Sequence, residues 1–272
     1  MASSSLLTSV TNDDKIKMVI ALWNGYRNGF SYPVNKFLYN NKPALKTPPF
    51  TENELDKFEY LQERVQDELE IMTKKYPIEL KLEKALDMYI LALESSFKMN
   101  VEWRVFSTET TRLYRGISEN PSQLKKILDS NKSFLSTSTL IDIAITHARE
   151  INSNKSSNTN AFVIEYTVEP GIPMIDMNKL GMDYMMIWQE EFVLPPGVKS
   201  TLLSEGTYSI PEVEKTKTMK TKKKVGKKYE YIYTEEKYTE PGYTIPLFKV
   251  HISKNASNSL TTGGKHVTSK TK

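Results

Sequence analysis

The chain contains no cysteine and only three histidines among its 272 residues. The lack of thiols excludes disulfide bonds, thiolate metal sites and a cysteine nucleophile. The histidines His147, His251 and His266 are too few and too scattered to favour a multi-histidine metal site. We therefore expect a protein that works without a bound metal.

Long apolar runs are also missing. No stretch approaches the roughly 20 apolar residues that a membrane-spanning helix needs. Residues 1–17 lack the basic head and apolar core of a secretory signal. We expect a protein with no membrane span and no signal peptide. Its expected location is intracellular or cytoplasmic, which includes the cytoplasm of a host cell or a virion.

The positive charge is small in total but unevenly distributed. The formal net charge is +4, yet eight lysines lie between Lys215 and Lys228. A solvated loop or hairpin tip explains such a block, and a docking patch for an acidic partner is the alternative. Interleaved aromatic residues, which single-stranded nucleic-acid binders use for stacking, are missing from 215–228, so nucleic-acid binding is not expected.

The spacing of apolar residues changes from helical to strand-like near residue 105. Before that point, Thr11 and Thr51 begin capping-box patterns ahead of two apolar stripes at helical spacing, and a third stripe starts at Leu82. Residues 31–50, with four prolines, predict a loop. After it, short apolar or alternating segments predict strands at 113–117, 133–140, 161–168, 172–176, 191–195, 198–203, 229–234 and 245–252. Helices followed by strands indicate an α+β fold with mostly antiparallel sheets.

The predicted organisation has four parts. A flexible N-terminus (1–10) precedes a helical part (11–105). A β-rich core (106–253) follows and includes a lysine-rich loop at 213–228. The last residues, 254–272, have almost no apolar content and are predicted to be disordered.

Three short polar motifs interrupt the predicted strands. They are Leu113-Tyr114-Arg115-Gly116, the hydroxyl run Ser136-Thr137-Ser138, and Gln189-Glu190-Glu191 ahead of an apolar strand that ends in Pro195-Pro196. Each has an ordinary explanation when taken alone. An arginine on a strand usually makes a surface ion pair of little energetic value, and two carboxylates before a strand are usually solvated.

Together, and in this order, the motifs resemble the mono-ADP-ribosyltransferases of the arginine–serine–glutamate class, which includes the clostridial exoenzymes. The resemblance covers roughly residues 105–205. It implies N-terminal helices packed on a two-sheet, mostly antiparallel β core. It also implies NAD as a substrate that binds in this core, no metal, and a target protein as acceptor.

The resemblance assigns a role to each motif. Glu191 is the catalytic carboxylate that stabilises the positively charged sugar formed when nicotinamide leaves, and Ser136 holds both this carboxylate and the ribose. Arg115 offers a forked donor to the pyrophosphate. The other residues implied in binding NAD are Tyr114, Gly116, Thr137, Ser138, His147 as a nicotinamide stacker, and Arg149 as a second phosphate ligand.

The residue two before the catalytic glutamate bears on the acceptor. Glutamine in this class goes with amide acceptors, so Gln189 favours an asparagine or glutamine on the target. Tyr184 and Trp188, in the loop before it, are expected to contact the target together with Gln189. Because side chains alternate along a strand, Glu190 should point to the other face.

Other functions stay open at this point. If Glu190 points into the site instead, the protein is an arginine-specific transferase. With water as acceptor, the same core acts as an NAD glycohydrolase. A degenerate NAD- or protein-binding module is the alternative without catalysis.

Overall fold

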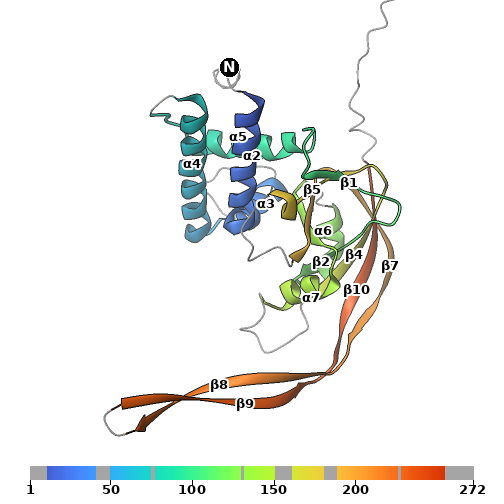
Figure 1. The fold of residues 1–272 in the computed structure, drawn as a ribbon. Helices are drawn as coiled ribbons and strands as arrows, with labels where there is room; N and C mark the ends of the chain where they lie inside the picture. The colour runs from blue at the N-terminus through green and yellow to red at the C-terminus, as the bar shows by residue number, and fades with distance from the viewer. Residues whose placement is uncertain are drawn as a thin grey trace, which may run out of the picture.

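The computed structural model describes residues 11–40, 50–74, 77–129, 132–150, 161–180, 189–225 and 228–254. In these residues helices come first and strands follow, as the hydrophobic spacing predicts (Figure 1). The predictions of a flexible N-terminus at 1–10 and of a disordered tail concern residues that lie, apart from Lys254, outside the described part of the chain. No helix of the described residues is both long and apolar enough to cross a membrane.

The helical part begins where its caps predict. Thr11 caps α2 (Asn12–Gly25) by accepting a hydrogen bond from the Asp14 backbone, which satisfies one of the unpaired amides of the first turn. Thr51 and Glu54 form a complete capping box at the start of the next long helix. The bounds of the helices that follow α2 are η1 (Tyr26–Phe30, a π-helix), α3 (Ser31–Tyr39), α4 (Glu52–Thr73) and α5 (Leu82–Ser96).

The prediction of a loop at 31–50 is wrong for its first part. Residues Ser31–Tyr39 form α3, with Pro33, Val34, Phe37 and Leu38 buried. Proline is tolerated here because Pro33 lies in the first turn, where a backbone N–H has no helical carbonyl to bind. The four prolines predicted a loop over the whole of 31–50, but only one of them lies within α3.

Eight strands form the large sheet, in the order β1-β5-β6-β3-β2-β4-β10-β7. Among the strand pairs of the described residues, only β4 with β10 is parallel. The elements of this half of the chain are β1 (Arg104–Phe106), β2 (Arg112–Ile117), η2 (Pro121–Gln123), α6 (Leu124–Asp129), β3 (Leu135–Ser138), α7 (Ile141–Glu150), β4 (Phe162–Val168), β5 (Pro173–Asp176), η4 (Met177–Leu180), β6 (Glu191–Leu194), β7 (Lys199–Ile210) and β10 (Tyr243–Ser253).

The resemblance implies a two-sheet β core, whereas the structure joins these eight strands in one sheet with a weak joint. A single residue pair, Tyr114 with Ser138, connects β2 to β3. Six pairs join β2 to β4 on one side of this joint, and four join β3 to β6 on the other. The sheet therefore divides into two four-stranded halves that meet at one point.

Helices cover the two halves differently. The helices α2 to α5 share one hydrophobic core with Phe134, Ile175 and Val193 of the β1-β5-β6-β3 half. Helices α6 and α7 pack on opposite faces of the other half. The alternation of β4 divides its residues between these faces, with Ile164 in the core under α6 and Val163 in the core under α7.

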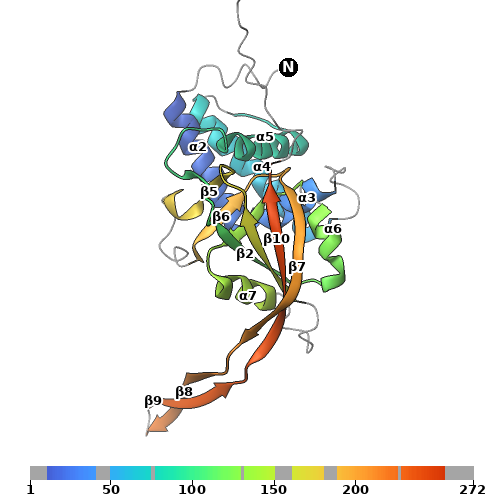
Figure 2. The same cartoon turned by 90° about the vertical axis from the view of Figure 1, so that its right-hand side faces the viewer.

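The lysine-rich segment is a strand, which corrects the prediction of a loop at 213–228. Residues Val213–Val225 form β8 and pair antiparallel with β9 (Lys228–Glu240) over their whole length. The two strands continue from β7 and β10 and extend away from the sheet as a long arm, beyond α7 in both views (Figures 1 and 2). Threonine and tyrosine, which favour strands, alternate with charged residues along it. Because the backbone of β8 pairs with that of β9, the lysines can form a row without a hydrophobic core beneath them.

Gly116 lets α7 approach β2 closely. A Cβ at this position would collide with the Ala144 carbonyl oxygen and would lie 2.7 Å from the Ala148 amide nitrogen. Both are backbone atoms, so no side chain can move aside to make room. This contact sets the position of α7 over the joint of the sheet.

We expect Gly116→Ala to lower the free energy of unfolding by about 1–3 kcal/mol or more, because the added methyl group forces the helix away from the strand. Thermal unfolding followed by circular dichroism measures the change. Gly206→Ala in β7 is the matched control, because a Cβ there meets no atom within 4 Å. Equal melting temperatures for the two variants would contradict this account of Gly116.

Candidate active site

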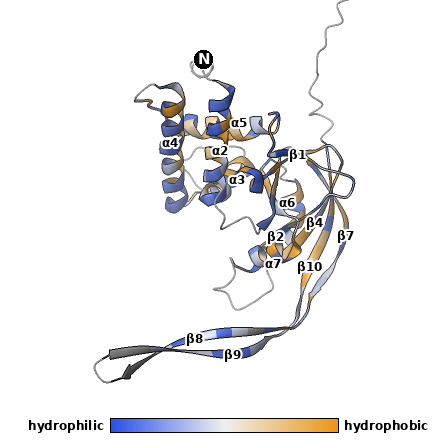
Figure 3. Cartoon of the chain, viewed as in Figure 1, coloured by the Kyte–Doolittle hydropathy of each residue, from blue (hydrophilic) through white to orange (hydrophobic). Residues whose placement is uncertain are grey.

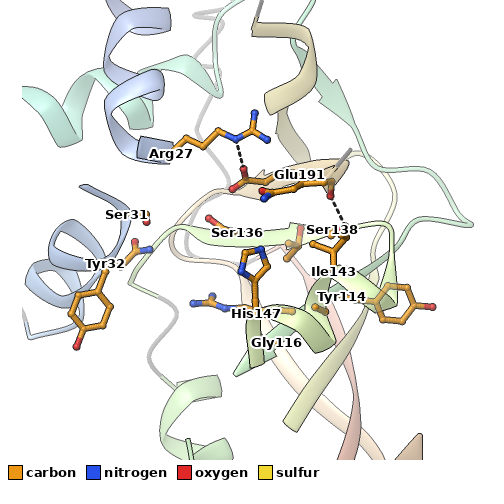
Figure 4. Close-up of a pocket in the computed structure, with 15 residues that line it drawn as sticks. Arg27, Ser31, Tyr32, Tyr114, Gly116, Ser136, Ser138, Ile143, His147 and Glu191 are labelled. Atoms are coloured by element: carbon orange, nitrogen blue, oxygen red, sulfur yellow. Dashed lines mark hydrogen bonds and ion pairs between the residues drawn. The ribbon is translucent and has the colours of Figure 1, made fainter. Parts of the chain in front are cut away.

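A cavity of about 380 Å³ opens where the helical part meets the joint of the sheet (Figure 4). Its volume falls in the range of pockets for small molecules and cofactors. The side chains that line it come from both parts of the chain: Arg27, Ser31, Tyr32, Asn35, Tyr114, Arg115, Gly116, Ser136, Thr137, Ser138, Ile143, Ala144, His147, Gln189 and Glu191.

Most of the residues singled out in the sequence line this cavity. All three motifs contribute, and the predicted site residues that belong to the lining are Tyr114, Arg115, Gly116, Ser136, Thr137, Ser138, His147, Gln189 and Glu191. The three motifs, which are far apart in the chain, therefore meet at one place in the fold.

Three of the predicted site residues, Arg149, Tyr184 and Trp188, are not in the described lining of the cavity. Arg149 is not among the lining residues. Its Nη1 donates to the Tyr243 hydroxyl at 2.8 Å, and its guanidinium stacks 4.6 Å from the centroid of that ring. Tyr184 and Trp188 lie outside the described residues, so their expected contact with a target stays a prediction.

Glu191 is the first residue of β6, where the strand leaves the cavity and enters the core. Its Oε2 lies 3.2 Å from Nε of Arg27, and the Arg27 side chain is only 5% exposed (Figure 4). The Ser136 hydroxyl hydrogen-bonds the same carboxylate. Burial raises the pKa of the Glu191 carboxyl above its ordinary value, while Arg27 and Ser136 act to lower it.

Ser136 also connects the site to the helical part. The Tyr26 hydroxyl hydrogen-bonds Ser136 and accepts from Nδ2 of Asn35 at 2.8 Å. Burial raises the pKa of Tyr26 to about 12, so this phenol stays neutral and can donate. Asn35 in turn accepts from the Phe134 backbone at 3.0 Å, just before β3. This network fixes the position of α3 relative to the hydroxyl motif.

The helices provide a part of the site that the sequence did not predict. Arg27, Ser31, Tyr32 and Asn35 line the cavity, but they lie far from the three motifs in the chain. Arg27 follows an ordinary helical stripe, and its spacing resembles that of a solvent-facing arginine. Only the fold brings it against a buried carboxylate.

A sharp turn at Glu190 separates the directions of its two neighbours. Glu190 has a φ of 42°, in the left-handed region, and its carboxylate accepts a hydrogen bond from the Thr139 hydroxyl. The Ser138 hydroxyl holds the turn by donating to the Gln189 carbonyl at 2.6 Å. Gln189 and Glu191 line the cavity, whereas Glu190 is exposed and does not. This arrangement favours Gln189 over Glu190 as the polar neighbour of Glu191.

The lining combines charges that suit a ligand with both anionic and sugar-like parts. Arg27 and Arg115 provide guanidinium groups, which bind phosphate through forked hydrogen bonds. Glu191 and the serine hydroxyls can bind sugar hydroxyls. The described residues contain no group of three or more His, Asp or Glu side chains that could hold a metal ion.

The ion pair between Arg27 and Glu191 should influence the ionisation of the carboxyl group. Arg27→Met should raise the pKa of the Glu191 carboxyl further, because the arginine that opposes the effect of burial is then missing. Titration of the carboxyl by carbon NMR, with Glu191→Gln used to assign the signal, measures the shift. Arg64→Met, which removes an arginine paired with Glu68 on α4, is the matched control and should leave this pKa unchanged. A pKa of Glu191 that does not rise in Arg27→Met would contradict the coupling.

Comparisons with known proteins give only distant similarity. No family model and no curated protein matches the chain. Among solved structures, the chain is similar to Plx2a, an ADP-ribosyltransferase toxin from Paenibacillus larvae, with a TM-score of 0.34 and 13% identity over 92% of this chain and 90% of that one. It is also similar to the enzymatic component C2-I of the C2 toxin from Clostridium botulinum, with a TM-score of 0.34 and 8% identity over 93% of this chain and 45% of that one.

Proposed function

We propose that the protein is a mono-ADP-ribosyltransferase that cleaves NAD, releases nicotinamide and transfers ADP-ribose to a side chain of a target protein. One observation carries the proposal. Arg115, Ser136, Gln189 and Glu191, which come from three motifs far apart in the chain, line the same cavity. The residues suit the substrate, since NAD has a diphosphate for the guanidinium groups and two riboses for the carboxylate and the hydroxyls.

In this proposal Glu191 stabilises the sugar as its bond to nicotinamide breaks. The electron pair of the C1′–N bond leaves with nicotinamide, and positive charge develops on the ribose. An ionised carboxylate held close to that charge lowers the barrier. Arg27 and the Ser136 hydroxyl favour the ionised form of Glu191 against the effect of burial.

The arginines and His147 hold the substrate in the reactive geometry. Arg115 binds the diphosphate as a forked donor, and Arg27 adds a second positive charge at the same cavity. His147 lines the cavity from α7, where its ring can stack on nicotinamide. Fixing the scissile bond and the acceptor together provides much of the rate acceleration in reactions of this kind.

Gln189 selects the acceptor in this proposal. Its amide can donate to and accept from the side-chain amide of an asparagine or glutamine, which no carboxylate can do. The acceptor nitrogen forms a bond to C1′ of the ribose and loses a proton. Where water takes this place, the same site acts as an NAD glycohydrolase.

The first test concerns Glu191. Glu191→Gln should reduce nicotinamide release from NAD by at least about 100-fold, because the change removes the charge that stabilises the transition state. The matched control is Glu190→Gln, which makes the same chemical change one residue away, outside the cavity. NAD should still raise the melting temperature of both variants by binding the folded state. Normal turnover in Glu191→Gln, or no stabilisation of the unaltered protein by NAD, would refute the proposed function.

The second test concerns the acceptor. Gln189→Glu should impair labelling of protein in a lysate supplied with labelled NAD, while hydrolysis of NAD continues. Hydrolysis depends on Arg115, Ser136 and Glu191, whereas transfer also needs an oriented acceptor nitrogen. Mass spectrometry of labelled peptides identifies the modified residue, which we expect to be asparagine or glutamine. Labelling of arginine that is lost in Glu190→Gln but kept in Gln189→Glu would indicate an arginine-specific enzyme instead.

A further inference from the structure

The arm formed by β8 and β9 carries the net positive charge of the protein. Residues 213–240 contain nine lysines and five glutamates, and the rest of the chain contains 28 basic and 28 acidic residues. The arm therefore accounts for the whole formal charge of +4. None of its described residues lines the cavity, and the described part of the arm shows little hydrophobic colour (Figure 3). The arm is thus a separate charged feature without a role in the proposed chemistry.

The pairing of the strands gives the two faces of the arm different compositions. Residues directly opposite each other in an antiparallel pair lie on the same face. On one face Lys217 is opposite Glu236 and Lys223 is opposite Glu230, and the one lysine–tyrosine pair, Lys215 with Tyr238, lies near the base of the arm. The other face has lysines opposite tyrosines towards the tip, and we call it the lysine–tyrosine face. Its pairs are Lys220 with Tyr233, Lys222 with Tyr231 and Lys224 with Tyr229.

The described side chains of the lysine–tyrosine face are open to solvent. Tyr231 is 52% exposed and Tyr233 is 62% exposed. Nζ of Lys220 lies 4.0 Å from the centroid of the Tyr231 ring and 5.7 Å from that of Tyr233. Aromatic rings with this exposure contribute little to a core, and the residue directly opposite Lys220 is a tyrosine and not a carboxylate.

We propose that the lysine–tyrosine face binds single-stranded nucleic acid. Alternate residues of a strand are about 7 Å apart, so Lys220, Lys222 and Lys224 occupy a regular row of register positions that suits a chain of phosphates. Tyrosine rings beside such a row can stack on unpaired bases without regard to sequence. The combination of a cationic track with stacking aromatics distinguishes this ligand from an acidic protein surface, which needs only the charge.

Residues 215–228 contain no aromatic residue, and for this reason the sequence alone predicts no nucleic-acid binding. Strand pairing supplies them from β9, in register with the lysines of β8. A duplex is a poorer ligand for this face, because its paired and stacked bases cannot stack on the tyrosines. This inference does not depend on the proposed transferase activity, since none of the described residues belongs to both the arm and the cavity lining.

The test measures binding of the full chain to a fluorescein-labelled oligonucleotide of about 20 nucleotides by fluorescence anisotropy, at about 50 and 200 mM salt. The triple variant Lys220→Gln, Lys222→Gln, Lys224→Gln should weaken binding at least tenfold. It should also reduce the slope of log affinity against log salt by about 2, as expected for three lost phosphate contacts. The matched control, Lys215→Gln, Lys217→Gln, Lys223→Gln, removes the same charge from the other face and should weaken binding less than about threefold.

The tyrosines provide an independent part of the test. Tyr231→Ala with Tyr233→Ala should weaken binding at least tenfold, whereas Tyr238→Ala, which is on the other face opposite Lys215, should have little effect. The proposal is overturned by no binding at the lower salt, by equal losses in the two lysine variants, or by a duplex or polyglutamate that competes as well as the single strand. Nicotinamide release should be unchanged in every arm variant, so a failure of this proposal is distinguishable from a failure of the transferase proposal.

Discussion

A single backbone pairing, between Tyr114 and Ser138, holds the two halves of the sheet together. The ladder stops on either side of this pair, and residues of both β2 and β3 line the cavity at this joint. Backbone groups near an interrupted ladder need other partners. Ser138 supplies two of these, because its hydroxyl donates to the Gln189 carbonyl and accepts from the Leu140 amide. The joint that limits the sheet is therefore also the point at which the polar motifs meet.

The helical part completes the site as well as covering the sheet. Tyr26, Asn35 and Arg27 reach from the first helices to the hydroxyl motif and to Glu191. A buried carboxylate without a partner would take up a proton or destabilise the fold. The guanidinium of Arg27 reduces this cost by favouring the ionised form, although burial still raises the pKa of the Glu191 carboxyl. Packing of the helices and ionisation of Glu191 are thus parts of one arrangement.

The body and the arm divide the charge of the protein between them. The body has equal numbers of basic and acidic residues, whereas the arm is basic and has a different composition on each face. A long hairpin without a core of its own can keep such a face only if its strands continue from a stable sheet. Strands β7 and β10 provide this support over eleven paired positions. The geometry separates the surface proposed for nucleic-acid binding from the cavity proposed for chemistry.

The sequence by itself determined that helices come first and strands follow, the helix caps at Thr11 and Thr51, and the three polar motifs, because each of these depends on residues close together in the chain. Strand alternation predicted that Gln189 and Glu191 point one way and Glu190 another, but residues 189 and 190 precede β6, and the left-handed backbone of Glu190 makes this separation. Tertiary structure alone decided that Arg27 faces Glu191 and that Arg149 stacks on Tyr243 instead of lining the cavity. It alone placed the tyrosines of β9 opposite the lysines of β8. The physical reason is the same in each case: these outcomes depend on contacts between residues far apart in the chain, and local spacing carries no information about such partners.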